Sequence, residues 1–223
     1  MTATITIRPL QRAELTTLWQ LGFSDPNAEW TRWNGPYFHD QLPTQTDFET
    51  IIGPRDWLIR PRNWVITRDG VIVGSVNWHF VDGSLKRWLE VGIIIYNQEH
   101  WGEHIGRTAL TKWLTHLFQE ETTLPHIGLT TWSGNMRMMQ LAEAVGLKQE
   151  AWIPQVRYWQ GQYFETIIGP RDWLIRPRNW VITRDGVIVG SVNWHFVDGS
   201  LKRWLEVGII IYNQEHWGEH IGR

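Results

Sequence analysis

The chain has 223 residues, with 21 Lys and Arg against 23 Asp and Glu, 17 tryptophans and no cysteine. The absence of cysteine excludes a disulfide framework, cysteine-ligated zinc, iron–sulfur clusters and thiol nucleophiles. The near-neutral charge balance argues against a protein that coats nucleic-acid phosphates. No apolar run approaches the length of a membrane span, and the first residues, MTATITIRPL, lack the apolar stretch of a signal peptide. We therefore expect a globular cytoplasmic protein that binds neither nucleic acid nor membrane.

A strand and several helical segments are predicted before residue 60. Residues 3–8 alternate apolar and polar side chains, which is the pattern of a half-buried strand. Apolar residues then recur at helical spacing in three ranges: 11–21, parts of 27–38, and 47–59. The Asp25-Pro26 pair is typical of a helix start, and Gly53-Pro54 predicts a break in the last of these helices.

Three β-rich runs follow and predict an antiparallel meander. They cover residues 64–67, 71–80 and 86–96. An Asp-Gly pair separates each run from the next and favours a tight turn. The remaining pattern gives a helix over about 106–120, a strand over 127–132, a helix over 135–145, and strands over 151–159 and 163–168. Helices, then a meander, then a strand–helix–strand end predict an α+β domain.

An internal repeat changes how the length is interpreted. Phe164 to Arg223 repeats Phe48 to Arg107, a segment of 60 residues, without a single change. Natural repeat arrays use shorter units, contain at least three of them and drift in sequence. Such identity indicates a recent tandem duplication, deliberate engineering or an error of sequence assembly. Residues 1–163 are the non-redundant part and suffice for one domain.

The two copies have different neighbours. The sequence FETII lies in a predicted helix at 48–52 and in a predicted strand at 164–168. We expect the same five residues to form a helix once and a strand once, because tertiary context overrides weak propensity. Residues 1–168 are expected to form the functional domain, which the strand 164–168 closes.

Residues 169–223 are not expected to form a second functional domain. The copy lacks the helix and the Asn135 segment that follow its original, so one active site per chain is predicted. Its apolar strands have no sheet of their own, and such strands are prone to associate. This segment is disordered, packs on the domain, or replaces its original in a homodimer formed by strand exchange.

The stretch from Glu90 to Thr108 carries the clearest functional signal. A predicted strand runs into a loop with glycines at 102 and 106, and the loop opens a helix. The first N–H groups of a helix lack intrahelical partners, lie at the positive end of the dipole and suit a pyrophosphate. Glycines before a helix also serve turn geometry alone, so this pattern by itself admits both interpretations.

Other motifs favour the phosphate interpretation. The stretch resembles the acetyl-coenzyme A loop of the GNAT superfamily of N-acetyltransferases, Q/R-x-x-G-x-G/A, at Glu99-His-Trp-Gly-Glu-His104. It looks most like the branch of ribosomal-protein N-terminal acetyltransferases, which shows Tyr-Trp-Gly-x-Gly-Ile-Gly where this chain has residues 100–106. The resemblance continues through Leu129 to Asn135, Leu141 to Leu147 and the hairpin at 157–161.

The resemblance covers roughly residues 3–168 and implies a GNAT-like fold with acetyl-CoA as co-substrate. This fold has a mixed, mostly antiparallel central sheet flanked by helices. In the family the strand before the loop widens at a bulge, which here would expose the amides of Ile94 and Ile95 to the thioester and pantetheine arm. The cofactor-binding residues implied are Ile94, Ile95, Trp101, Gly102, Glu103, His104, Ile105, Gly106, Arg107, Thr108 and Asn135. Asn135 heads the later helix, which it would cap while also suiting the pantetheine.

Three positions depart from the family pattern. Glu99 replaces Gln or Arg, and His104 replaces the second glycine or alanine. The His104 amide stays available at helical φ/ψ, whereas a loop with positive φ there is strained. Ala142 stands where many relatives carry a tyrosine general acid, so it cannot protonate the leaving thiolate.

Glu90, on the strand before the loop, is the candidate general base, acting directly or through a water; a solvated strand glutamate is the alternative. Four tryptophans lie where relatives place the acceptor cleft, with packing as the alternative for each: Trp30, Trp33, Trp78 and Trp88. Four others fit packing roles: Trp57, Trp64, Trp113 and Trp152. His100 and His104 stand four apart, but they straddle a glycine and no third ligand is evident, so no metal is predicted.

The resemblance therefore predicts an N-acetyltransferase that moves acetyl from acetyl-CoA to a primary amine, either a peptide N-terminus or a small molecule. Transfer is direct, since a chain without cysteine forms no cysteinyl acyl-enzyme. The alternative is a non-catalytic module of the same fold that binds acyl-CoA or another ligand.

Overall fold

The computed structural model describes residues 3–59, 61–121, 124 and 126–170, and beyond them the backbone of strands at 179–184, 187–196 and 205–211. Contacts between residues divide the chain into two units, Met1–Leu174 and Ile175–Arg223. The helices and a larger sheet belong to the first unit. A smaller sheet belongs to the second.

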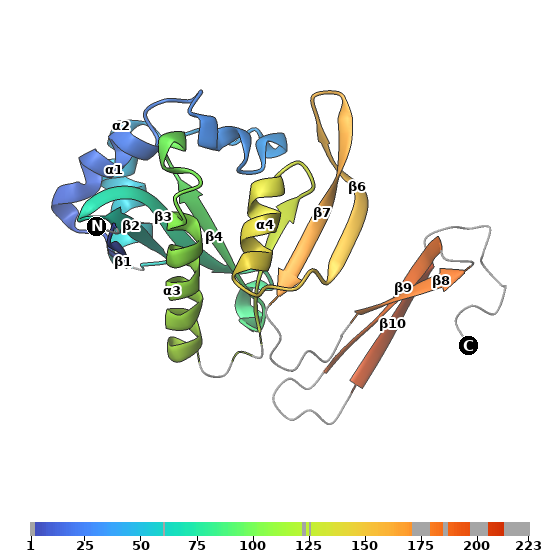
Figure 1. Cartoon of the computed structure of the whole chain (residues 1–223). Helices are drawn as coiled ribbons and strands as arrows, with labels where there is room; N and C mark the ends of the chain where they lie inside the picture. Colours follow the sequence, from blue (N-terminus) through green and yellow to red (C-terminus); the bar gives the residue numbers. More distant parts are fainter. Residues whose placement is uncertain are drawn as a thin grey trace. The chain divides into compact units, whose positions relative to one another are not determined.

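A sheet of seven strands forms the centre of the first unit (Figure 1). Its strands are β1 (Ile5–Pro9), β2 (Asn63–Arg68), β3 (Val71–Phe80), β4 (Leu89–Ile95), β5 (Ile127–Trp132), β6 (Ala151–Trp159) and β7 (Gln162–Pro170). They lie in the order β1-β2-β3-β4-β5-β7-β6. Neighbouring strands are antiparallel except β4 and β5, which are parallel. The predicted α+β class and mostly antiparallel sheet are confirmed.

The α-helices are α1 (Leu15–Gly22), α2 (Gln45–Asp47), α3 (Ile105–Glu120) and α4 (Met136–Ala144). Short 3-10 turns lie at Arg12–Glu14, Glu29–Arg32, Pro36–Phe38, Gly83–Leu85 and Gln98–His100, and π-helical segments at Phe48–Ile52 and Pro54–Ile59. In Figure 1, α3 and α4 stand side by side in front of the sheet. Of the helices described, none combines the length and the apolar character needed to cross a membrane.

Alternating side chains along the strands build a core on each face of the sheet. Ile66 and Val76 belong to the core that α3 covers, whereas Val65 and Ile72 belong to the core beneath α1 and the π-helical segments. The helix face predicted from spacing is confirmed in α3, where the following residues are buried: Ala109, Leu110, Trp113, Leu114 and Leu117. The sheet is thus covered on both faces, and its rim carries the loops.

Several predicted elements are confirmed with their bounds, namely β3, β5 and β6. The predicted helix start at Asp25-Pro26 is wrong, because the Asp25 carboxylate instead accepts the Asn27 N–H at 2.8 Å and forms a turn. The predicted break near Gly53-Pro54 is also wrong. Gly53 N–H donates to the carbonyl of Phe48, five residues back, and this wider π register continues the helical path past Pro54.

Trp57 and Trp113 are buried as predicted, but Trp152 is 48% exposed. It lies on β6, which is an edge strand of the larger sheet. A side chain there lacks a neighbouring strand on one side, so the predicted packing role of Trp152 is wrong.

The repeated sequence takes two structures, as predicted. Residues 48–52 form a π-helical segment, whereas residues 164–168 lie in β7. β7 lies between β5 and β6 and pairs with both, so these copied residues complete the sheet. The partner strands that surround residues 164–168 decide their structure, because the sequence is the same at both sites.

The rest of the copy keeps the strand pattern of its original. In the second unit, β8 (Asn179–Arg184), β9 (Val187–Phe196) and β10 (Leu205–Ile211) form an antiparallel sheet in the order β10-β9-β8. Asn179 pairs with Asn193, as Asn63 pairs with Asn77 in the first copy. Both copies also shift register at the same place, before the threonine of the first strand.

Candidate active site

An opening in the sheet lies where β4 and β5 diverge. The two strands pair only at Leu89 with Ile127 and at Glu90 with Gly128. Beyond Glu90, no described strand pairs with the edge of β4 that faces away from β3. The bulge expected in β4 is absent, because its pairing with β3 runs without a register shift. The opening arises from divergence of the parallel pair.

The opening exposes alternate amides of β4. Tyr96 N–H donates to Val73 C=O of β3 at 3.1 Å, so Ile94, two residues earlier, also turns its N–H toward β3. Ile93 and Ile95 turn theirs toward the opening. Of the two amides expected there, that of Ile95 faces the opening, whereas that of Ile94 faces β3. The amide of Ile93, which was not expected there, also faces the opening.

A narrow pocket of about 190 Å³ fills this opening. Its lining is mostly apolar and consists of Trp30, Trp33, Asn34, Ile93, Ile94, Ile95, Trp101, Gly106, Asn135, Arg137, Met138 and Leu141. This volume is below that of typical pockets for drug-sized ligands and suits a slender chain better than a nucleotide. Five of these positions were not predicted as site residues: Asn34, Ile93, Arg137, Met138 and Leu141.

Residues 97–104 form the α3 loop, which ends at the start of α3. The Asn97 side chain accepts the Glu99 N–H at 3.0 Å and orders its first turn. Within α3 the first N–H with an intrahelical acceptor is that of Thr108, which donates to His104 C=O at 3.0 Å. The amides of residues 105–107 precede it and lack intrahelical partners. Of these three residues, Gly106 lines the pocket.

His104 adopts left-handed backbone angles, φ 61° and ψ 8°, directly before α3. His104 therefore does not have the helical φ/ψ at which a histidine would be unstrained. A side chain with Cβ is disfavoured in this region by about 1–2 kcal/mol, which explains why glycine suits the position. The loop is formed nevertheless, at the expense of local strain.

Side chains of the α3 loop point in two directions. Glu103 accepts a hydrogen bond from Arg68 Nη1 at 2.6 Å, and His100 Nδ1 lies 3.2 Å from the same nitrogen. Trp101 instead donates from Nε1 to Ile95 C=O at 3.0 Å and so covers the pocket. Among the described residues, no three His, Asp or Glu side chains gather as a metal site would require.

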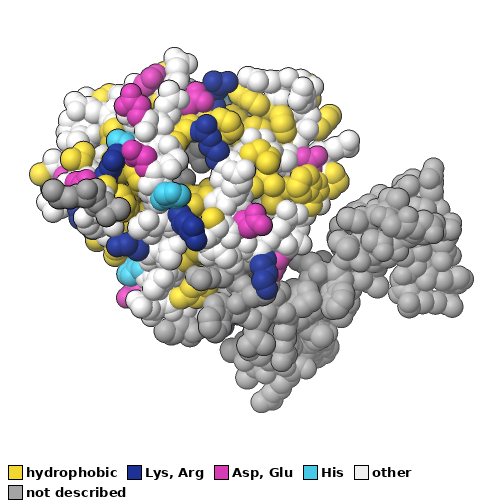
Figure 2. Space-filling view, viewed as in Figure 1, with side chains coloured by type: hydrophobic (Ala, Val, Ile, Leu, Met, Phe, Trp, Pro, Cys, Tyr) yellow, Lys and Arg dark blue, Asp and Glu magenta, His cyan; other side chains and the backbone are white. Residues whose placement is uncertain are grey.

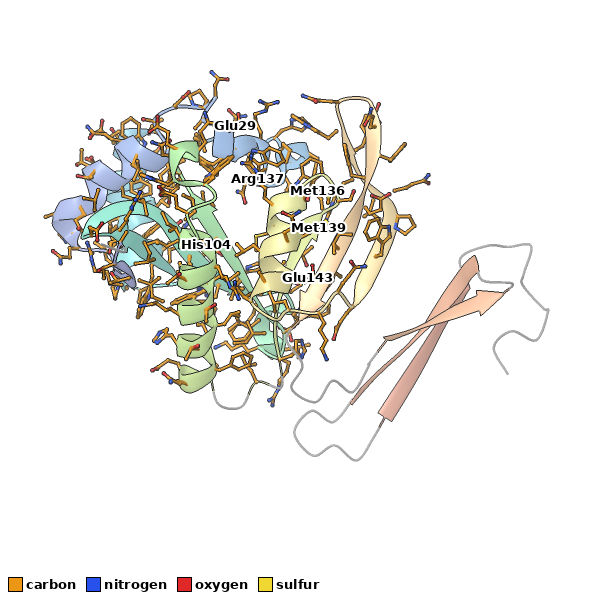
Figure 3. All side chains as sticks on the ribbon, in the orientation of Figure 1. Glu29, His104, Met136, Arg137, Met139 and Glu143 are labelled. Atoms are coloured by element: carbon orange, nitrogen blue, oxygen red, sulfur yellow. The ribbon has the colours of Figure 1, made fainter. Side chains whose placement is uncertain are left out.

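Arg137 joins the elements around the pocket. Its guanidinium lies 4.4 Å from the centre of the Trp101 ring and 5.4 Å from that of Trp33. No described carboxylate forms an ion pair with it. Figure 3 shows Arg137 at the end of α4 that faces the segment carrying Glu29, with His104 at the start of α3. The cation is thus held by aromatic faces beside the pocket.

Asn135 caps α4, as expected. Its Oδ1 accepts the Met138 N–H at 3.0 Å, and its Nδ2 donates to Trp33 C=O at 3.0 Å. Trp132 Nε1 reaches the same carbonyl at 3.2 Å. These two bonds hold Trp33 against β5 and α4. The segment after α1 that carries Trp30, Trp33 and Asn34 therefore covers the pocket at its roof.

Glu90 lies on β4 at the inner end of the opening and is 6% exposed. Its Oε1 accepts a hydrogen bond from Thr130 Oγ1 at 2.8 Å. Burial raises the pKa of the Glu90 carboxyl above its usual value, while hydrogen bonds from Thr130 and Trp88 and the nearby His79 oppose the shift. A buried carboxylate with a raised pKa is suited to accept a proton near neutral pH.

The four tryptophans expected at the acceptor cleft separate into two groups. Trp30 and Trp33 line the pocket. Trp78 instead packs on Phe80, with ring centres 5.5 Å apart, beneath the guanidinium of Arg62. Trp88 lies outside the pocket but beside the Glu90 carboxyl. Spacing along the chain did not distinguish these cases, because the position of a tryptophan in the sequence does not decide whether its ring lines a pocket or packs on a neighbouring side chain.

The comparisons with known proteins agree with this geometry. The acetyltransferase (GNAT) domain family matches residues 4–148. Similar solved structures include a GNAT-family acetyltransferase from Bacillus anthracis, at 14% identity and TM-score 0.60, covering 77% of this chain and 96% of that one. YncA from Salmonella typhimurium, solved with acetyl-CoA, is 17% identical with a TM-score of 0.57, covering 76% and 94%.

Spermidine N-acetyltransferase from Vibrio cholerae, in complex with CoA and spermine, is 19% identical with a TM-score of 0.59, covering 76% of this chain and 95% of that one. At these identities the structures establish the fold. A comparison with curated proteins finds no match. The family match covers more than half of the sequence and coincides with the opened sheet and the α3 loop. The chain belongs to the GNAT family of acetyltransferases.

Proposed function

We propose that this chain transfers acetyl from acetyl-CoA to a primary amine by direct attack. The observation that carries the proposal is the opening between β4 and β5. It joins unpaired helix amides at one end to the buried Glu90 carboxyl at the other. A thioester arm placed along it would run from a phosphate-binding helix start to a proton acceptor.

The residues present fit acetyl-CoA, which would supply the activated acetyl group. The amides of residues 105–107 and the dipole of α3 suit the pyrophosphate. The pocket has the narrow, apolar form that the pantetheine arm requires. Arg137, which lines the same pocket as Gly106 and has no ion-pair partner among the described carboxylates, would add a positive charge near the phosphates.

Glu90 would remove the proton that the amine must lose on attack, directly or through a water. The amides of Ile93 and Ile95 face the opening and would donate to the thioester oxygen as negative charge develops there. Ala142 carries no proton donor, so the leaving thiolate would take its proton from water.

A binding module without turnover is the alternative, and Ala142 and the strained His104 favour it. Release of free thiol from acetyl-CoA, measured across small amines and N-terminal peptides, separates the two functions. We expect thiol release that requires an amine. Tight binding of CoA without release under any amine would instead establish the module.

The Glu90→Gln variant tests the mechanism. Loss of a positioned general base is expected to lower kcat about 100- to 1,000-fold, with affinity for acetyl-CoA unchanged. Glu143→Gln is the matched control, since Glu143 is exposed and lies at the other end of α4 from Arg137 (Figure 3). Equal rates for wild type and Glu90→Gln would contradict the role of Glu90.

We further propose that the second meander favours homodimers by strand exchange. β8 repeats β2, whose outer edge pairs with β1 in the first unit. β10 repeats β4, which pairs with β5. Because β8 and β10 keep the register of β2 and β4, they could pair with β1 and β5 of a second chain. Light scattering of the full chain against residues 1–174 tests this, and monomers in both samples over a wide concentration range would contradict it.

A further inference from the structure

An arginine on the β6–β7 hairpin lies among aromatic rings that border the candidate site. The Arg157 guanidinium lies 5.0 Å from the centre of the Tyr37 ring and 5.3 Å from that of Phe38. Tyr37 in turn packs edge-on against Trp132, with ring centres 5.8 Å apart. Trp132 bonds the Trp33 carbonyl at the roof of the pocket, so contiguous side chains join Arg157 to the site.

Arg157 and Glu90 face the same side of the sheet. Thr130 bonds Glu90, and Trp132 follows two residues later on β5 and so shares its face. Phe164 of β7 packs against Trp132, with ring centres 4.8 Å apart, and its backbone pairs across the hairpin with that of Arg157. The proton acceptor and the arginine therefore border one surface, at opposite ends.

The charge of Arg157 has no counter-ion in the part of the chain that is described. Arg157 takes part in none of the ion pairs formed by the described residues. The Nε–H is buried without an acceptor, and Thr166 Oγ1, on β7 two residues beyond Phe164, is also buried without a partner. An unpaired buried polar group is unfavourable, so both atoms are suited to a ligand that brings oxygen atoms.

The neighbouring hydroxyl strengthens this preference. Burial raises the pKa of Tyr37, while the charge of Arg157 and a hydrogen bond from it oppose the shift. The phenol therefore remains protonated at neutral pH and available as a donor. The guanidinium and the phenol are in contact, and Thr166 adds a buried hydroxyl on the strand that pairs with β6. These groups form a donor set for an anion, and the guanidinium fork matches a carboxylate in particular.

We propose that the acceptor is an amine that also carries a carboxylate, and that Arg157 binds this carboxylate. The proposal rests on the proposed function and names its substrate class. A polycationic amine would instead face an unpaired arginine at this end of the surface. Glu90 is level with Pro170 of β7 through Gly128, whereas Arg157 is level with Phe164, six residues away along the same strand. Three strand spacings across the sheet and six residues along it put the backbones of Glu90 and Arg157 roughly 24 Å apart, before their side chains shorten the gap. This separation favours acceptors whose amine and carboxylate are several bonds apart.

Linear ω-aminocarboxylates of increasing length, each paired with the alkylamine of equal length, provide the test. We expect kcat/KM for each aminocarboxylate to exceed kcat/KM for the matched alkylamine about 10- to 100-fold. Among the aminocarboxylates, kcat/KM should rise from glycine toward longer chains. Dipeptides and spermidine complete the panel. Equal rates for carboxylates and alkylamines, or a preference for spermidine, would overturn the proposal.

Arg157→Gln should lower kcat/KM for the aminocarboxylates to that of the matched alkylamines, whose own kcat/KM should not change. Arg157→Lys should retain part of the preference for the carboxylate. Arg62→Gln is the matched control, because the Arg62 guanidinium also lies over an aromatic ring, that of Trp78, which does not line the pocket. An equal loss for both substrate series would overturn the role of Arg157. The wild-type panel decides the question if a variant does not fold. Absence of thiol release with every amine would instead refute the proposed function.

Discussion

The α3 loop contains two residues with left-handed backbone but very different side chains. Gly102 has φ 86° and His104 has φ 61°. Glycine adopts such angles without strain, whereas histidine does not. The sequence identified the loop through its glycines and the helix that follows. It did not reveal the sign of φ at residue 104, because that sign depends on the path of the loop into α3.

Exchanging these residue types tests the strain. His104→Gly should stabilise the protein by about 0.5–1 kcal/mol, since relief of strain exceeds the entropy that glycine loses on folding. Gly102→Ala should destabilise it by about 1 kcal/mol through conformation alone, because a Cβ there would meet no atom within 4 Å. Denaturant unfolding measures both changes, and a stabilising Gly102→Ala would show that the loop is not constrained as described.

The buried Glu90 carboxyl links activity to stability. Its pKa is raised in the folded chain, mainly by burial, so the native state holds this proton to higher pH than the unfolded state does. Stability due to this group is therefore full below the unfolded pKa and falls as pH rises through the folded pKa. The ionised base is the active form, so activity should rise over the range in which stability falls.

Glu90→Gln should therefore unfold at a higher temperature than wild type at neutral pH. The difference should vanish at pH 3, where both chains carry a neutral side chain at this position. Each unit by which the pKa is raised corresponds to about 1.4 kcal/mol. Thermal unfolding from pH 3 to pH 8 measures the effect. A variant that is less stable than wild type throughout this range would contradict it.

At the scale of elements, the sequence predicted the regular parts of the fold. Strong alternation and helical spacing located β3, β5, β6 and α3, because these periods follow from which face is buried. The divergence of β4 and β5 was not predictable in the same way. It depends on how far two strands stay parallel, and Ile93 and Ile94 have the same side chain although their amides face opposite edges.

The repeated FETII sequence allows one substitution to be compared in two structures. Ile51 is 56% exposed in the π-helical segment, whereas its copy, Ile167, is 5% exposed in β7. Ile167→Ala should destabilise the first unit by about 2–4 kcal/mol, and Ile51→Ala by less than about 0.5 kcal/mol. Chemical denaturation of both variants tests this, and equal effects would contradict the two environments.

At the scale of the whole molecule, the copied segment contributes to both units. Its first residues lie between β5 and β6, and its later strands form the sheet of the second unit. The boundary between units falls after Leu174, whereas the copy begins at Phe164. The point where the repeat starts is therefore not the point where the compact units separate.

Two truncations distinguish these boundaries. A chain that ends at Leu174 keeps β7 and should retain the fold and kcat/KM of the full chain within about twofold. A chain that ends at Tyr163 loses the strand that pairs β5 with β6 and should aggregate or unfold, because it exposes strand edges on both sides. Circular dichroism and thiol-release assays compare the two. A folded, active chain ending at Tyr163 would contradict the role of β7.

The composition of β7 has a consequence for how such sheets change. Residues 164–170 of the strand that completes the sheet have the same sequence as the helical residues 48–54, and the strand still pairs on both sides. The position between β5 and β6 thus depends on an alternating pattern and a sufficient length more than on a particular sequence. An alternating segment of sufficient length can therefore complete a sheet even though the same residues form a helix elsewhere in the chain.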